Sequence, residues 1–97
     1  MKLSGKINRF LRAEGHHLNP VMQTGKDGIT ANVLEEIEKA LTEFELIKVK
    51  IGKGPVPRKE AALKIQQGTE AHVIQIVGRI ILLFRQAKHA SRYKLPE

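Results

Sequence analysis

The 97-residue sequence contains no cysteine and no tryptophan. Without cysteine, the chain has no disulfide framework and no thiolate ligands for zinc, which agrees with a reducing compartment. The longest apolar run, Ile80 to Phe84, is far too short to cross a bilayer. No apolar signal segment follows the N-terminus, because Lys6, Arg9 and Arg12 come first. We therefore expect a cytoplasmic protein without a membrane span.

Side chains that commonly perform catalysis are also scarce. The chain has a single aspartate, Asp27, and its serines, Ser4 and Ser91, lie near the termini. Because an enzyme needs a nucleophile, a general base or a metal, we expect no catalysis, no small-molecule substrate and no cofactor. The adjacent histidines His16 and His17 lack the ligand number and spacing of a zinc site, so no metal is predicted. A capping or RNA-contacting role suits His16 better.

Aromatic side chains are few, with three phenylalanines and one tyrosine. We interpret Phe10, Phe44 and Phe84 as core residues, which leaves only Tyr93 exposed. A sheet that stacks bases on several exposed aromatic rings is therefore disfavoured.

Positive charge, in contrast, is abundant. The chain has 17 Lys and Arg against 10 Asp and Glu, which gives a net charge of +7. A small basic domain attracts polyanions through counterion release, so nucleic acid is the leading partner. Solubility alone, an acidic protein or an anionic lipid would also account for the charge. Half of the acidic residues lie in or beside one predicted helix, which indicates an acidic flank opposite a basic face: Glu35, Glu36, Glu38, Glu43 and Glu45.

Hydrophobic periodicity predicts one α/β domain with the element order α-β-α-β-α-β-β and a four-stranded mixed sheet packed with helices. The predicted helices cover residues 4–14, 30–44 and 57–67, and the predicted strands cover residues 20–22, 46–51, 72–77 and 80–85. Gly15 and Gly68 are expected to end helices, and Gly78-Arg79 is expected to form a type II′ hairpin turn. The apolar runs 72–77 and 80–85 predict central or doubly covered strands. Loops are expected at 52–55 and elsewhere between these elements.

The domain is expected to span residues 1–97, with a folded core over 1–85 and a basic tail over 86–97. The tail has no periodicity, so we interpret it as an extended or partly mobile arm. In the strand 46–51, alternation places Lys48 and Lys50 together on one sheet face. In the first helix, Lys2, Lys6, Arg9 and Arg12 form a basic stripe, which is either a solvated face or part of a binding surface.

The segment Gly25-Lys26-Asp27-Gly28 links a short strand to a helix for which Thr30 is a candidate N-cap. Backbone N–H groups in such a turn point outward near the positive end of the helix dipole, so the turn can hold an anion. The alternative is a plain connection whose glycines only supply positive φ. Gly-x-x-Gly alone is a common pattern, so the surrounding sequence must decide between anion binding and a plain connection.

Those surroundings resemble a known family. The separated motifs are Leu11-Arg12, His16 to Pro20, Gly25 to Thr30, Val33-Leu34, Glu45 to Lys50, and Gln75 to Arg79 through Leu83-Phe84-Arg85. Together they resemble a CRM domain (chloroplast RNA splicing and ribosome maturation), of the stand-alone bacterial YhbY type. The chain departs from the family pattern at Gly15, Asn19 and Phe84. Asn19 lacks a positive charge and Phe84 lacks a hydroxyl that the family commonly has there.

The resemblance implies a fold similar to the C-terminal domain of translation initiation factor three and a loop comparable to that of KH domains. It also implies association with ribosomal RNA and precursor large ribosomal subunits, or intron splicing as in plant relatives. The expected RNA-binding residues are Gly25, Lys26, Asp27, Gly28, Lys6, Arg9, Arg12, His16, Lys48, Lys50 and Arg85. The alternatives are a protein-interaction adaptor with incidental RNA affinity, an RNA chaperone of the splicing type, and, less favoured, a duplex-DNA binder.

Overall fold

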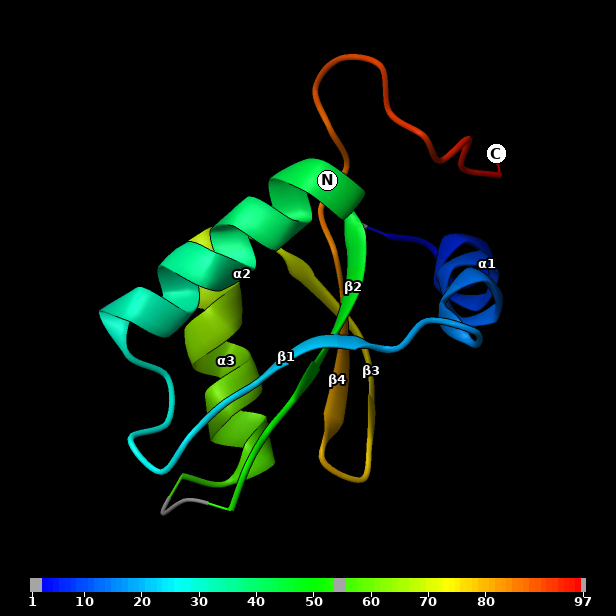
Figure 1. Cartoon of the computed structure of the whole chain (residues 1–97). Helices are drawn as coiled ribbons and strands as arrows, with labels where there is room; N and C mark the ends of the chain where they lie inside the picture. The colour runs from blue at the N-terminus through cyan, green and yellow to red at the C-terminus, as the bar shows by residue number, and fades with distance from the viewer. Residues whose placement is uncertain (1–2, 54–55, 97) are drawn as a thin grey trace.

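The computed structural model describes residues 3–53 and 56–96. Lys2 of the predicted stripe, Gly54 and Pro55 of the predicted loop, and Glu97 of the tail lie outside this range. Helices and strands follow one another in the predicted order (Figure 1). They are α1 (Gly5–Gly15), β1 (Pro20–Gln23), α2 (Ala31–Phe44), β2 (Leu46–Lys50), α3 (Arg58–Thr69), β3 (His72–Val77) and β4 (Ile80–Phe84).

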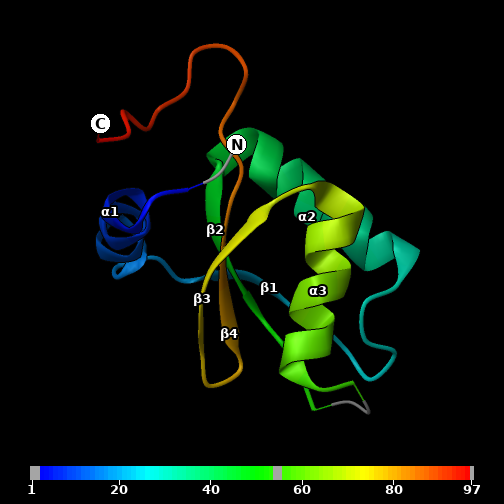
Figure 2. The ribbon, with the colours of Figure 1, turned by 180° about the vertical axis from the view of Figure 1, so that it is seen from behind.

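The four strands form one mixed sheet in the order β1-β2-β4-β3. Strands β1 and β2 are parallel, and the other neighbours are antiparallel, which confirms the predicted mixed sheet. Helices α2 and α3 cover one face of the sheet, and α1 lies against the other face (Figures 1 and 2). The hairpin between β3 and β4 has Gly78 at φ +59° and pairs Val77 with Ile80, as predicted for a type II′ turn.

Each face of the sheet has its own apolar core. Toward α2 and α3, the sheet contributes Ile47, Val49, Ile81 and Leu83, which pack with Ile37, Leu41 and Ile65. Toward α1, it contributes Leu46, Leu82 and Phe84, which pack with Leu11 and with the half-buried Ile7 and Phe10. Alternate side chains of β2 and β4 thus enter different cores, as the period of two requires.

Gly15 ends α1 as predicted, whereas Gly68 does not end α3. Gly68 lies inside α3, which ends at Thr69 with Glu70 in the left-handed conformation at φ +61°. A Cβ on Gly68 would lie 2.9 Å from a methyl carbon of Leu34, and one on Gly15 would lie 2.7 Å from a methyl carbon of Leu82. Both glycines therefore let a helix approach its neighbour closely.

Strand β3 corrects a second expectation. It lies at the edge of the sheet, and Val77 near its end is 61% exposed. Of these two apolar runs, only the one in β4 forms a central strand, where Ile81 to Phe84 are all buried. The apolar run in β3 does not imply double coverage because α1 shields only part of that face.

Up to Pro96, the tail after β4 forms no helix or strand, but it is attached to the domain rather than extended from it. The carboxylate of Glu45 accepts hydrogen bonds from the Ala87 N–H (2.9 Å) and the Arg92 N–H (2.8 Å). The Ser91 hydroxyl donates to the same carboxylate (2.5 Å). Glu45 is 3% exposed and has φ +67°, so the acidic flank predicted from the sequence does not include it.

Two aromatic residues also differ from expectation. Phe44 is 38% exposed at the end of α2, where the Arg92 guanidinium lies 5.8 Å from its ring centroid. Tyr93 is half-buried and packs edge-on against Phe84, with ring centroids 5.9 Å apart. The tail therefore extends the core on the α1 side, where Leu95 joins the same cluster.

The Glu45 anchor predicts a pH-dependent contribution to stability. Burial alone would raise the pKa of Glu45, but hydrogen bonds from Ala87, Ser91 and Arg92 and the Arg92 charge lower it below the ordinary 4.5. A group with a lowered folded pKa stabilises the fold above its unfolded pKa and loses that contribution as pH falls through its folded pKa. We expect Glu45→Gln to reduce the free energy of unfolding by about 1–3 kcal/mol at pH 7.

Urea denaturation of the parent and the variant at pH 7 and pH 3 measures this effect. The difference should shrink at pH 3, which lies below the ordinary pKa of 4.5, because the unfolded chain then binds a proton that the folded carboxylate resists. Glu43→Gln, at an exposed neighbour, is the control and should change stability little. An equal Glu45→Gln effect at both pH values would contradict the electrostatic anchor.

Candidate nucleic-acid interface

The Gly-x-x-Gly segment forms a tight turn between β1 and α2. The N–H of Gly28 donates to the carbonyl of Gly25 (3.1 Å), so Lys26 and Asp27 are the exposed central residues. Gly28 has φ +71°, which a side chain would oppose, whereas Gly25 has no positive φ. A Cβ on Gly25 would meet nothing within 4 Å. The backbone conformation therefore favours glycine at 28 but not at 25.

The turn leads directly into the N-terminus of α2. The Thr30 hydroxyl accepts a hydrogen bond from the Val33 N–H (3.2 Å), which confirms the predicted N-cap. The first turn of α2 has no acidic residue, so no carboxylate there offsets the positive end of the helix dipole. The turn can thus present Lys26 and backbone amides to an anion, with Asp27 as an opposing charge.

Hydrogen bonds fix the base of the turn to the end of the sheet. Thr24 is buried; its N–H donates to the Lys50 carbonyl (2.9 Å), and its hydroxyl accepts from the Gly52 N–H (3.0 Å). The Arg79 side chain donates to the Ile51 carbonyl (2.8 Å). The β1–α2 turn, the start of the β2–α3 connection and the β3–β4 hairpin therefore meet at one end of the sheet (Figure 1).

The α1 face of the sheet is uncovered next to this end. None of the three helices of the described residues lies beside the hairpin half of that face in either view (Figures 1 and 2). Strand pairing places two rows of side chains across it. One row is Pro20, Lys48, Leu82 and Gln75, and the next is Gln23, Lys50, Ile80 and Val77. Lys48 and Lys50 share one face, as predicted. Gln75 lies in the row of Lys48 and Gln23 in the row of Lys50, which the sequence did not predict.

Helix α1 adds cations at the upper border of this open face. Arg12 and His16 line the same hollow as Lys48, and both side chains are exposed. Arg9 and Lys6 are exposed further along α1. The Lys48 ammonium donates to the carbonyl of Leu18 (3.0 Å), which ties the α1–β1 connection to β2.

The structure does not place the helix stripe next to the Gly-x-x-Gly turn. Helix α1 and the turn lie at separate corners of the molecule, and β1 runs between them (Figures 1 and 2). The open sheet face with Lys48 and Lys50 lies between the two. A ligand that touches both must therefore be extended, as a nucleic-acid strand is.

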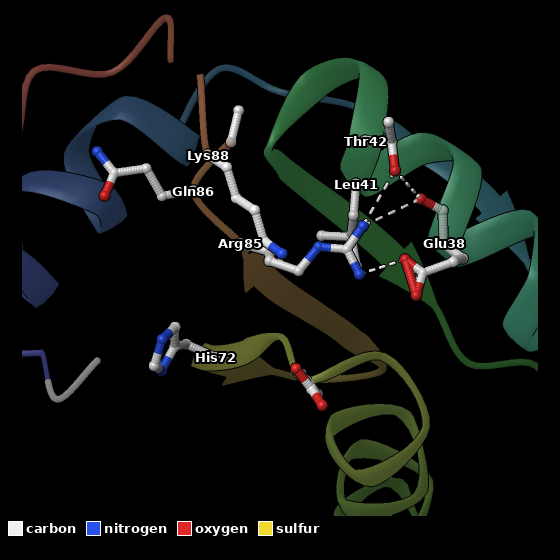
Figure 3. A pocket seen from close by; sticks show the side chains of 9 residues that line it. Glu38, Leu41, Thr42, His72, Arg85, Gln86 and Lys88 are labelled. Carbon is white, nitrogen blue, oxygen red and sulfur yellow. Dashed lines mark hydrogen bonds and ion pairs between the residues drawn. The ribbon is translucent and has the colours of Figure 1, made fainter. Parts of the chain in front are cut away.

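Arg85 lies on the opposite side of the sheet from this surface. Its guanidinium forms an ion pair with Glu38 and donates to the Thr69 carbonyl (2.9 Å) and the Thr42 hydroxyl (3.0 Å). Figure 3 shows Arg85 with Glu38 and Thr42 beside a hollow of about 690 Å³ that also includes His72. Burial lowers the pKa of His72. Arg85 thus links α2 and α3 to β4 and does not widen the basic face, contrary to expectation.

Within residues 3–53 and 56–96, no three His, Cys, Asp or Glu side chains are grouped so that they could hold a metal. The rings of His16 and His17 pack edge-on, with centroids 5.2 Å apart. Over the same residues, no helix has the length and apolarity needed to span a membrane.

The family model of the CRS1 / YhbY (CRM) domain matches residues 3–85. The chain belongs to this family. The match covers α1 through the end of the sheet, including the turn and both rows of the open face.

Its relatives span bacteria and archaea. A protein of Bacillus subtilis named as the probable RNA-binding protein YqeI is 35% identical over 95 residues, which are 97% of this chain and 99% of that protein. An RNA-binding protein of Haemophilus influenzae is 41% identical over 92% of this chain and 91% of its own. A probable RNA-binding protein of Methanocaldococcus jannaschii is 40% identical, over 95% of this chain and 70% of its own.

The fold is likewise found in a solved structure. The solution structure of a Staphylococcus aureus protein, described as a candidate for RNA binding, superposes with a TM-score of 0.83 at 33% identity. The superposition covers 98% of this chain and all of that protein. The three-helix, four-strand architecture is therefore that of the family.

The two turn glycines should differ in their effect on stability. Gly28→Ala should lower the free energy of unfolding by about 1 kcal/mol, because alanine resists φ +71°. Gly25→Ala should leave it unchanged or slightly raised, since the position is open and has no positive φ. Chemical denaturation measures both. A larger loss for Gly25→Ala than for Gly28→Ala would contradict the turn geometry.

Proposed function

We propose that this protein is a non-catalytic RNA-binding protein of the cytoplasm that acts in ribosome assembly. In this proposal it binds ribosomal RNA on precursor large subunits. The observation that carries the proposal is a set of unneutralised cations along one face and its adjoining turn. Arg9, Arg12, Lys26, Lys48 and Lys50 form no ion pair with any carboxylate of the described residues.

The arrangement suits an RNA backbone. Cations spaced across a sheet face and a turn can neutralise successive phosphates, and each neutralised phosphate releases counterions. The turn at the α2 N-terminus adds backbone donors of the kind that hold phosphate groups. The names of the relatives, which describe RNA-binding proteins, support the same class of ligand.

The expected mode of binding favours RNA shape and single strands over duplex DNA. Phosphate contacts carry no direct sequence information, so selectivity must come from RNA shape and from base contacts near the cations. Each helix in the described residues packs an apolar side against the sheet, and none projects as a recognition helix for a major groove. A protein adaptor would instead use the acidic exposed side of α2, where Glu35, Glu36 and Glu43 lie.

Removing three of the cations tests the proposal. We expect the combined change Arg12→Ala, Lys26→Ala and Lys50→Ala to lower affinity for a ribosomal RNA fragment at least about tenfold at 0.1 M salt. The slope of log affinity against log salt should become shallower by about 2, because each of the three lost phosphate contacts contributes about 0.7 for a single strand. Fluorescence anisotropy over a salt series measures both quantities.

The matched control removes the same charge elsewhere, with Lys39, Lys59 and Lys64 changed to alanine. All three lysines are exposed on α2 and α3, so the variant should keep most of the affinity and the slope. Equal losses in both triple variants would show that only net charge matters. In sucrose gradients, the parent should sediment with precursor large subunits and the first triple variant should not. Failure of the parent to do so would refute the ribosomal part of the proposal.

A further inference from the structure

A hollow lies on the open half of the α1 face, between the last turn of α1 and the β3–β4 hairpin. Its volume is about 260 Å³, and its floor is formed by Val77, Ile80 and Leu82. Sites that enclose drug-sized molecules measure about 300–1,000 Å³. The hollow is therefore the size for one small ring system rather than for a larger ligand.

The floor is apolar because the sheet continues beyond the helix that covers it. Leu82 is buried beneath Gly15, where the lack of a Cβ lets α1 sit close to β4. Ile80, two residues earlier on the same face, is only half-buried, and Val77 opposite it is 61% exposed. The apolar floor of the hollow thus becomes more exposed from the end of α1 toward the hairpin, and it can contact the face of a planar ring.

A bulge in β3 turns the side chain of Gln75 toward this floor. Val73 pairs with Leu83 and Gln75 pairs with Leu82, so Ile74 is an extra residue in β3. Without the bulge, alternation would send the side chain of Gln75 to the α2–α3 face, with Val73. With it, Gln75 is exposed and lines the hollow. Its amide offers both donors and an acceptor beside an apolar floor.

The rim of the hollow is cationic. Arg12, His16 and Lys48 line it, and no acidic residue among those the structure describes does so. Lys50 lies in the next row of the same face, opposite Ile80. The apolar floor and the amide suit a heterocyclic base, and the positive rim suits the phosphates attached to it. A peptide side chain would not account for the positive rim.

We propose that this hollow holds one unstacked base of a single-stranded RNA, with Gln75 hydrogen-bonded to the base edge. Val77, Ile80 and Leu82 contact the ring, and Arg12 and Lys48 bind the flanking phosphates. The site rests on the proposed function and adds to it a source of base selectivity that the Gly-x-x-Gly turn lacks. Sequence-specific RNA recognition generally uses unstacked bases in this way.

The test compares single-stranded RNA decamers that share a backbone and differ in their bases. The probes are oligo(rA), oligo(rC), oligo(rU) and an abasic decamer, measured by anisotropy with the full chain at fixed salt. The parent should bind at least one homopolymer more tightly than the abasic strand. Gln75→Ala should weaken binding to that homopolymer at least about fivefold, leave the abasic strand unchanged and reduce the differences among bases.

Gln75→Leu is a second variant that keeps a side chain of similar size and should show the same loss of discrimination. Gln67→Ala makes the same chemical change at an exposed position of α3 and should behave as the parent does. If the Gln75 variants keep the preferences of the parent, or if the parent binds the abasic strand as tightly as every homopolymer, the base site is wrong. If the parent binds none of the four strands, the proposed RNA-binding function itself fails.

Discussion

Strand β2 determines where the cations lie, because its alternate side chains serve opposite faces of the sheet. Ile47 and Val49 are buried against α2 and α3, while Lys48 and Lys50 lie on the α1 face. A slip of one residue in register would expose the apolar pair and bury both lysines, which is costly on both counts. Packing of the core therefore fixes the positions of Lys48 and Lys50. The hydrogen bonds of Thr24 to Lys50 and Gly52 hold the Gly-x-x-Gly turn at the end of the same strand.

Local patterns predicted most of this fold. Helical spacing in α2, alternation in β2 and the Gly78-Arg79 turn each depend on neighbours in sequence, and all three were confirmed. For the candidate site, the Thr30 cap and the shared face of Lys48 and Lys50 were also predicted correctly. These features need no knowledge of what packs against them.

Features that depend on distant partners were missed. Glu45 resembles its exposed neighbours in α2 until the tail returns to bond it, and Arg85 is a free cation until Glu38 lies beside it. The β3 edge and its bulge follow from strand order, so neither the exposure of Val77 nor the direction of Gln75 could be inferred from a continuous apolar run. Sequence reasoning thus found the charges of the site but not its apolar floor.

An NMR titration of the ¹⁵N-labelled protein with a single-stranded ribosomal RNA fragment would locate the RNA on the open sheet face and the turn. We expect amide signals to shift together in the turn, in the end of β1, in β2 near Lys50 and in β3 near Gln75. Signals from the outer sides of α2 and α3 should stay in place. Shifts confined to α2 and α3, with the turn and the open sheet face unaffected, would contradict this location of the RNA.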